Sequence, residues 1–201
     1  MAKESFYSLK EKKRKNLIDS IEECLKVQSY EKLTTEDILK IAEISRGSFY
    51  KYFEDKDDAI HTYVDERLKY LLEIYKICII ECNYKLFDGT VEAYNCLKYM
   101  MKESVYKAFY NNIKSLLGIL VYNLNIKKYD EEIKDFIDWC IQNTTEGKTV
   151  LSTKEQMVEV IDLLMTVFMA TTMKMVILPG EELDNIDFSK KISIIKKGVI
   201  G

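Results

Sequence analysis

A short run of cationic and hydroxyl side chains in the first quarter of the chain has the chemistry of a phosphate-binding surface. Arg46 and Lys51 carry positive charge, and Ser45, Ser48 and Tyr50 carry hydroxyl groups. A guanidinium group forms paired hydrogen bonds with a phosphate or with the edge of a guanine, and an ammonium group attracts phosphate as a point charge. We therefore interpret this run as part of a surface that contacts nucleic acid.

Two short helices joined by a tight turn are predicted to position these side chains. Thr34 or Thr35 can cap the first helix, because a hydroxyl oxygen at that position accepts a backbone N–H group. Ile38, Ile41 and Ala42 follow at a helical spacing, so we expect them to form one buried face. This face ends just before the turn.

The second helix is expected to begin after Ser45, which can cap it, and to direct Phe49 and Phe53 inward. Gly47 has no Cβ, so the backbone there can approach a sugar-phosphate chain closely. Asp55 can cap the helix that follows. The outer side of the second helix is then formed by Arg46, Gly47, Ser48, Tyr50, Lys51 and Tyr52.

Small, polar and positively charged residues on a short second helix fit a helix-turn-helix, in which that helix enters the major groove of DNA. Lys56, at the start of the next helix, could pair with a phosphate beside the N–H groups of that helix. An ordinary helical hairpin with solvated charges is the alternative, and the outer residues taken together favour DNA. The residues expected to contact DNA are Thr34, Thr35, Ser45, Arg46, Gly47, Ser48, Tyr50, Lys51, Tyr52 and Lys56.

A string of the form G-x-F-Y-x-Y-F-x-x-K runs from Gly47 to Lys56. With Ile38 to Ala42 it resembles the TetR/AcrR family of bacterial transcription regulators, over about Lys10 to Leu72. The resemblance implies a three-helix DNA-binding domain and a helical C-terminal domain that binds a small-molecule effector and forms a homodimer. It also implies that the protein is a repressor. In the family pattern a glycine usually occupies the turn position that is Glu43 here, and a Glu would be strained at the positive φ of that turn.

The composition predicts an all-α protein. The 201 residues include one Pro and seven Gly, so few residues interrupt helices. The formal net charge is −3, and positive charge is concentrated locally, as in the cluster of Lys10, Lys12, Lys13, Arg14 and Lys15. Because attraction to phosphate is screened over about 8 Å at physiological salt, the local placement of charge can outweigh the total.

The resemblance implies a DNA-binding domain at residues 10–72 and a regulatory and dimerisation domain at residues 73–201. Residues 1–9 are expected to fray. A long helix from Lys56 to about Cys82 is expected to join the two domains, and a loop from Asn83 to Gly89 to end it. Further helices are predicted at about 90–109, 111–124, 129–142, 153–178 and 188–199.

The stretch from Val160 to Leu178 is apolar on nearly all sides. A membrane span is disfavoured because Asp162 and Lys174 would lie inside it and Pro179-Gly180 follows directly. We expect a second subunit to cover it, because in the resembling family the last two long helices pair with their copies as a four-helix bundle. Two second helices about 34–36 Å apart would then contact a palindromic operator in double-stranded DNA.

The C-terminal domain is rich in Tyr, Phe and Met, and the resemblance implies an effector pocket between its helices. Such side chains can line a pocket, and they can equally form an ordinary core. Glu103 and Asp162 are the acids expected near the pocket, which would suit a cationic compound. The candidate ligand-binding residues are Tyr99, Met100, Glu103, Tyr106, Tyr110, Tyr122, Trp139, Asp162, Met165 and Met169.

A catalytic function is disfavoured, because the chain has one His and neither a G-x-x-x-x-G-K-[ST] nor a G-x-G-x-x-G motif. We expect no enzyme activity, no cofactor and no bound metal. The odd number of cysteines, five, and the lack of an apolar N-terminal segment favour reduced thiols in a cytoplasmic protein. The remaining alternative is a helical protein-interaction module without DNA binding, which would not need Arg46, Gly47 or Lys51.

Overall fold

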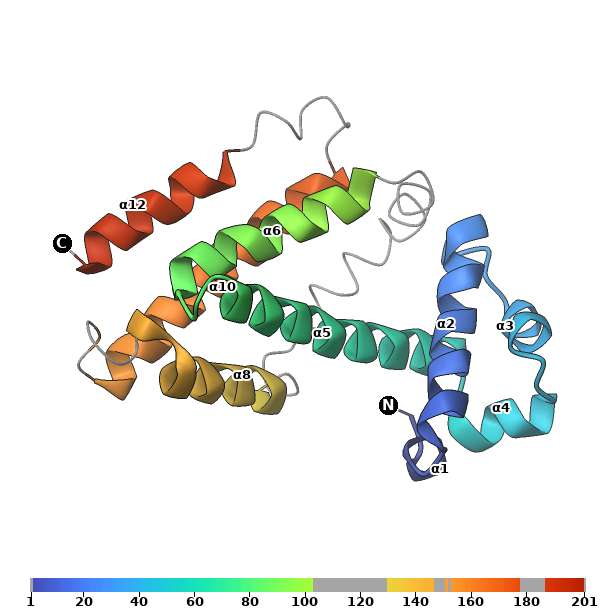
Figure 1. The fold of residues 1–201 in the computed structure, drawn as a ribbon. Helices are drawn as coiled ribbons and strands as arrows, with labels where there is room; N and C mark the ends of the chain where they lie inside the picture. The colour runs from blue at the N-terminus through green and yellow to red at the C-terminus, as the bar shows by residue number, and fades with distance from the viewer. Residues whose placement is uncertain (1, 103–129, 147–150, 152, 178–186, 201) are drawn as a thin grey trace. The chain divides into compact units, whose positions relative to one another are not determined.

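The computed structural model describes residues 2–102, 130–146, 151, 153–177 and 187–200. Within these residues the secondary structure is helical and contains no strand, which confirms the predicted all-α class. The helices are α1 (Glu4–Tyr7), α2 (Glu11–Val27), α3 (Thr35–Ala42), α4 (Arg46–Tyr52), α5 (Lys56–Glu81), α6 (Leu86–Lys102), α8 (Asp130–Asn143), α10 (Lys154–Ile177) and α12 (Phe188–Ile200) (Figure 1).

The described residues fall into two compact units. The first unit, which we call the head, ends at Tyr70, and the second, which we call the body, begins at Leu71. The long helix α5 therefore contributes its first part to the head and its second part to the body. The assignment of residues 10–72 to DNA binding and of residues 73–201 to regulation and dimerisation remains a prediction.

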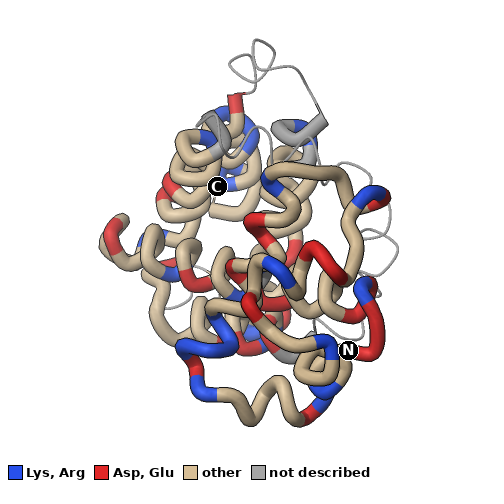
Figure 2. Tube along the Cα trace, turned by 90° about the vertical axis from the view of Figure 1, so that its right-hand side faces the viewer, with Lys and Arg blue, Asp and Glu red and all other residues tan. Residues whose placement is uncertain are grey.

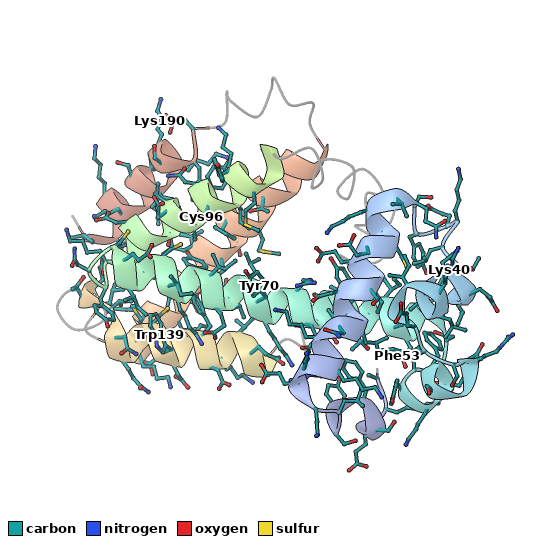
Figure 3. The ribbon with its side chains drawn as sticks, turned by 45° about the vertical axis from the view of Figure 1, so that its right-hand side comes forward. Lys40, Phe53, Tyr70, Cys96, Trp139 and Lys190 are labelled. Carbon is teal, nitrogen blue, oxygen red and sulfur yellow. The ribbon has the colours of Figure 1, made fainter. Side chains whose placement is uncertain are left out.

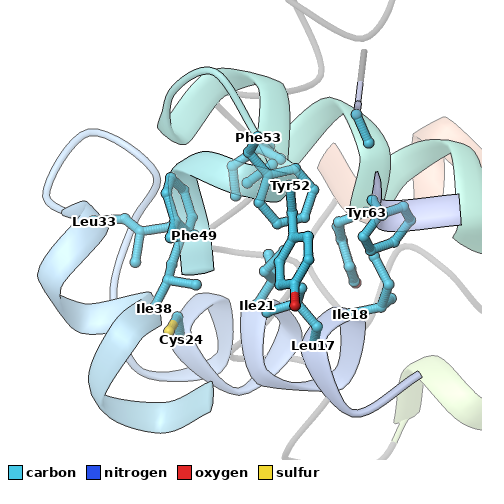
Figure 4. Packing of buried hydrophobic residues seen from close by; sticks show 14 of the residues in the cluster. Leu17, Ile18, Ile21, Cys24, Leu33, Ile38, Phe49, Tyr52, Phe53 and Tyr63 are labelled. Atoms are coloured by element: carbon cyan, nitrogen blue, oxygen red, sulfur yellow. The ribbon is translucent and has the colours of Figure 1, made fainter. Parts of the chain in front are cut away.

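The head is built around apolar side chains from its helices. Ile21 of α2, Ile38 of α3 and Phe49 of α4 are fully buried, and all three lie in one cluster (Figure 4). Phe53, just after α4, packs with its ring centroid 5.3 Å from that of Phe49. These contacts hold the two short helices, which could not be stable alone at seven and eight residues.

Ion pairs attach α2 to α5 inside the head. The guanidinium group of Arg67 lies 2.8 Å from a carboxylate oxygen of Asp19 and 2.7 Å from one of Glu22. The hydroxyl group of Tyr63 also donates a hydrogen bond to Glu22, at 3.2 Å. This network therefore holds α2 against the part of α5 that belongs to the head.

The expectation that residues 1–9 fray is wrong for the part described. Glu4–Tyr7 form the single turn of α1, and Phe6 is completely buried in the core cluster of the head. The Phe6 ring packs 5.3 Å from the ring of Phe53. Burial of this large aromatic side chain helps to hold a segment that has a weak helical pattern of its own.

Aromatic rings from several helices pack together in the core of the body. Tyr75 of α5 is 5.1 Å from both Phe136 of α8 and Phe168 of α10. Tyr94 of α6 stacks 4.2 Å from Phe188 of α12. Each pair joins two different helices, so the rings carry much of the packing between α5, α6, α8, α10 and α12.

The turn between α5 and α6 is shorter than predicted. The long helix ends at Glu81, as expected, and Asn83 and Tyr84 then take positive φ angles of 56° and 60°. However, α6 already begins at Leu86, whose backbone N–H donates a hydrogen bond of 2.9 Å to the buried carboxylate of Glu146. Gly89, expected in the loop, lies inside the helix.

Three later helices correspond to predicted ones. Within the described residues, α8, α10 and α12 lie close to the expected ranges 129–142, 153–178 and 188–199. The helix expected at 111–124 and the end of that expected at 90–109 lie outside the described residues. In the part of the chain that the structure describes, every helix is too short or too polar to cross a lipid bilayer.

Candidate nucleic-acid interface

The first helix of the predicted motif is closed by a reciprocal pair of hydrogen bonds. Thr34, at the N-cap, accepts a hydrogen bond from the backbone N–H of Asp37, and the Asp37 carboxylate accepts one from the Thr34 N–H at 2.9 Å. Hydrogen bonds from Thr34 lower the pKa of Asp37, so the carboxylate remains charged where the helix dipole favours it. Thr34 therefore caps α3, and Thr35 is the first residue of that helix.

The turn between α3 and α4 has the positive φ that the resemblance implied. Glu43 has a φ of 52° and a ψ of 41°, in the left-handed region. The backbone N–H groups of Glu43 and Ile44 both donate to the carbonyl oxygen of Leu39, which closes α3. The turn thus keeps its shape although the Cβ of Glu43 is sterically unfavourable at a positive φ.

Replacing Glu43 by glycine is expected to stabilise the head by about 1 kcal/mol, because glycine adopts this φ without a steric penalty. The gain is measured as a rise in the urea midpoint at an unchanged slope. Glu43→Ala is the control, since it removes the charge and keeps the Cβ. An equal gain in both variants would show that the charge, and not the backbone, is responsible.

The second helix, α4, begins as predicted. The Ser45 side chain caps it by accepting a hydrogen bond from the Ser48 N–H at 3.1 Å. Ser48 is half-buried, and its hydroxyl group lies 3.0 Å from that of Ser45. Gly47 is exposed, and a Cβ built on it would meet only the Ser45 Oγ, at 4.0 Å. The backbone of α4 is therefore open to the outside at this position.

The cations of α4 are accessible. The Arg46 guanidinium lies 3.4 Å from the Glu36 carboxylate, but the two side chains are 68% and 64% exposed. A pair this exposed contributes little and is readily exchanged for a stronger anion. Arg46 also lies 5.8 Å above the ring of Tyr50, and no described residue pairs with the ammonium group of Lys51.

The burial of two residues of the motif is the reverse of the prediction. Tyr52, expected on the outer side, is only 6% exposed and lies in the core cluster of the head (Figure 4). Ile41, expected to be buried, is 41% exposed. Seven residues make only two turns of helix, so the buried side of α4 includes Tyr52 as well as Phe49. Tyr52 is thus a packing residue.

The ammonium group of Lys56 contacts Tyr30 of the same chain. It donates a hydrogen bond to the carbonyl oxygen of Tyr30 at 3.1 Å and lies 4.2 Å from the centre of the Tyr30 ring. Burial, and then the hydrogen bond to Asp57, raise the pKa of Tyr30 to about 12, so the phenol stays protonated. The expected phosphate contact of Lys56 would require this arrangement to open.

A shallow groove lies beside the turn of the motif. It has a volume of about 360 Å³, and its lining includes Lys13 and Asn16 of α2 together with Ser45 and Ser48. The sequence placed a basic cluster before the first helix, but Lys12 to Lys15 lie inside the first turns of α2. The sequence also did not show that this cluster lies beside the start of α4. No feature of the sequence indicated that Asn16 would lie in this groove. Positive charge from α2 is thereby added to that of α4.

The charge of the head is mixed. Basic and acidic residues both occur along its trace (Figure 2), and Lys12 to Lys15 of α2 form an uninterrupted basic run. Lys40 is exposed on α3, close in sequence to the acidic Glu36 and Glu43 (Figure 3). The attraction to DNA therefore depends on a few placed cations, as the net charge of −3 requires.

The six candidate ligand-binding residues that the structure describes are half-buried or exposed. Tyr99 is 72% exposed and Asp162 is also exposed, whereas Met100, Met165 and Met169 are half-buried. Trp139 is half-buried on α8, with the Lys76 ammonium 6.0 Å from its ring (Figure 3). The other candidates, Glu103, Tyr106, Tyr110 and Tyr122, lie outside the described residues.

Comparison with known proteins agrees with this geometry. Residues 17–60, which run from within α2 to the start of α5, match the family described as "Bacterial regulatory proteins, tetR family". No curated protein matches the sequence significantly. The solved structure of Salmonella enterica GusR has a TM-score of 0.54 at 13% identity, with 96% of this chain and 98% of that chain covered. That of the dihydroxyacetone kinase operon activator DhaS has a TM-score of 0.49 at 12% identity, with 93% of each chain covered.

The likeness to GusR shows a shared fold, and the family match adds the identity of the DNA-binding segment. The matched residues contain α3, the Glu43 turn and α4, and they include every residue that the sequence predicted to contact DNA. Residues 17–60 therefore form a DNA-binding segment of the kind found in the tetR family of bacterial regulatory proteins, which supports a DNA-binding transcription regulator.

Proposed function

We propose that the protein binds a palindromic operator as a homodimer, with α4 of each subunit in the major groove. The observation that carries this proposal is the outer side of α4. It presents Arg46, Gly47, Tyr50 and Lys51 to the outside, and Gly47 leaves its backbone uncovered. In this arrangement Arg46 contacts a base edge and Lys51 a phosphate, while Ser45 and Ser48 hold the start of α4 in place.

Dimer formation is supported by apolar side chains that the body leaves uncovered. Leu163 of α10 is 44% exposed and Ile194 of α12 is 64% exposed, on the two helices expected to meet their copies. A dimer would also supply the second α4 that a palindrome requires, since one short helix contacts too few base pairs for useful specificity.

We further propose that the body binds a small-molecule effector and that the protein is a cytoplasmic repressor released from DNA by that effector. The support is the resemblance to ligand-responsive regulators and the flexible Met100, Met165 and Met169 side chains of the body. An effector that moves the population of DNA-binding forms from 99:1 to 1:99 must prefer one form by about 5.5 kcal/mol.

The roles of Arg46 and Lys51 predict different effects of alanine substitution. Arg46→Ala is expected to weaken binding to the operator by about 1–3 kcal/mol and to relax the base preference at one position of each half-site. Lys51→Ala is expected to weaken binding to all sequences alike and to reduce the slope of log K against log salt by about one unit for each phosphate that it no longer neutralises.

Fluorescence anisotropy with a duplex selected from a random library, and with a scrambled duplex of the same composition, measures both effects. Lys32→Ala is the control, because Lys32 is an exposed lysine of the head that precedes α3 and lies outside the proposed interface. If both interface variants bind the two duplexes as the parent does, α4 is not the contacting helix.

A further inference from the structure

The C-terminal end of α4 is held by the N-terminal segment of the chain. The Lys3 ammonium donates a hydrogen bond to the carbonyl oxygen of Tyr50 at 2.9 Å, and the Ser5 hydroxyl group donates one to that of Lys51. The backbone N–H of Lys3 donates to the carbonyl oxygen of Tyr52 at 2.8 Å. Three successive carbonyl groups of α4 therefore take their partners from residues 3–5, which lie more than 45 positions earlier in the sequence.

These carbonyl groups are the ones that a helix leaves without partners. The last four C=O groups of an α-helix have no N–H group further along the helix, and the helix dipole places negative partial charge there. Lys3 brings a cation to this end of α4, where such a charge is favourable. Since α4 has only seven residues, these three bonds involve the carbonyl groups of nearly half of its residues.

The segment that supplies these donors is itself anchored. Phe6 is fully buried and packs 5.3 Å from the ring of Phe53, the residue that follows α4. Ala2 is also buried, and Leu9 packs against the same cluster. The donors at residues 3–5 are therefore fixed by contacts on both sides of them, and they hold α4 against the rest of the head.

We propose that residues 2–9, which we call the arm, position α4 for sequence-specific contact with DNA. Lys3 and Ser5 are the positioning residues: they act on the backbone of α4 and do not touch DNA. This proposal rests on the proposed function, because it concerns the same helix. Contacts with base edges require side chains to be placed within a fraction of an ångström, whereas contacts with phosphates tolerate more displacement. Loss of the arm's hydrogen bonds should therefore reduce specificity more than general affinity.

A graded series of variants tests the arm. Ser5→Ala and Lys3→Met each remove one side-chain donor, and the double variant removes both. Lys3→Pro with Ser5→Ala removes all three donors, because proline lacks the backbone N–H, and the Lys3 φ of −73° fits its ring. Ser8→Ala is the matched control, since the Ser8 hydroxyl group donates to the Ser5 carbonyl within the arm and not to α4.

The readouts are affinity for the selected duplex, affinity for a scrambled duplex, the salt slope, and helical content by circular dichroism. We expect the double variant to bind the selected duplex about tenfold more weakly and the three-donor variant to bind it more weakly still. The affinity for scrambled DNA, the salt slope and the helical content are expected to stay as in the parent, and Ser8→Ala is expected to bind normally.

Three results would overturn the proposal. Unchanged binding to the selected duplex in the three-donor variant would show that α4 does not need the arm. A salt slope reduced by about one unit in Lys3→Met would make Lys3 a phosphate contact. An equal loss on both duplexes would indicate a general loss of folding. Arg46→Ala is measured beside the series: if it also binds normally, the proposed function fails, and if it alone weakens binding, only the arm proposal fails.

Discussion

Substitution of Gly47 by leucine is expected to abolish binding to the operator while the protein remains folded. The space around Gly47 is empty on the protein side, where the nearest atom to a Cβ would be the Ser45 Oγ at 4.0 Å. A leucine side chain therefore projects outward from α4 and occupies the space that the sugar-phosphate chain would fill. We expect a loss of at least about 100-fold in affinity, the scale of a steric conflict of about 3 kcal/mol.

Gly47→Ala separates the effect of side-chain bulk from the loss of the glycine itself. Alanine in place of a helical glycine is expected to stabilise the head by about 0.5–1 kcal/mol, and its single methyl group should weaken DNA binding far less than leucine does. Circular dichroism and size-exclusion chromatography verify the fold and the assembly of both variants. A leucine variant that is folded and binds the selected duplex normally would exclude a close approach of DNA at Gly47.

Substitution of Gly89 by alanine is expected to destabilise the body by about 3 kcal/mol. A Cβ at this position would lie 2.5 Å from the Cα and 2.9 Å from the backbone nitrogen of Ile79. Both atoms belong to the backbone of α5, which cannot rotate away as a side chain can. The two helices would have to separate, and overpacking of this kind costs about 1–3 kcal/mol or more.

Gly198 in α12 provides the matched control, because no atom lies within 4 Å of a Cβ built there. Gly198→Ala should leave stability unchanged or raise it by up to about 1 kcal/mol. Urea unfolding followed by circular dichroism compares the two variants at the same protein concentration. Equal stability of Gly89→Ala and the parent would mean that α5 and α6 are not packed at backbone contact near Gly89.

Features fixed by neighbouring residues could be predicted from the sequence. The caps at Thr34, Ser45 and Asp55 were predicted because each requires only a side-chain oxygen and an N–H group three residues or fewer away. The strained φ of Glu43 was implied by the resemblance, and the end of α5 by the break in its apolar pattern. These features do not depend on what packs against them.

Features that depend on distant contacts could not be predicted. The arm binds α4 through residues 3 and 5, whose partners lie 46–49 positions away, and no local pattern encodes that pairing. Tyr52 was expected on the outer side because only Phe49 and Phe53 were expected to point inward, and Lys56 was expected to pair with a phosphate. The core and Tyr30 instead decide where these two side chains pack. Gly89 looked like a turn signal, whereas the structure uses it for close packing of two helices.

The central claim is that two copies of α4 contact DNA as a symmetric pair. Selection of bound duplexes from a random library, followed by sequencing, tests it most directly because it assumes no operator. We expect an inverted repeat whose half-sites are centred about 34–36 Å apart, one turn of the DNA helix or a multiple of it. Enrichment of a single unpaired site, or no enrichment above the starting library, would contradict the claim.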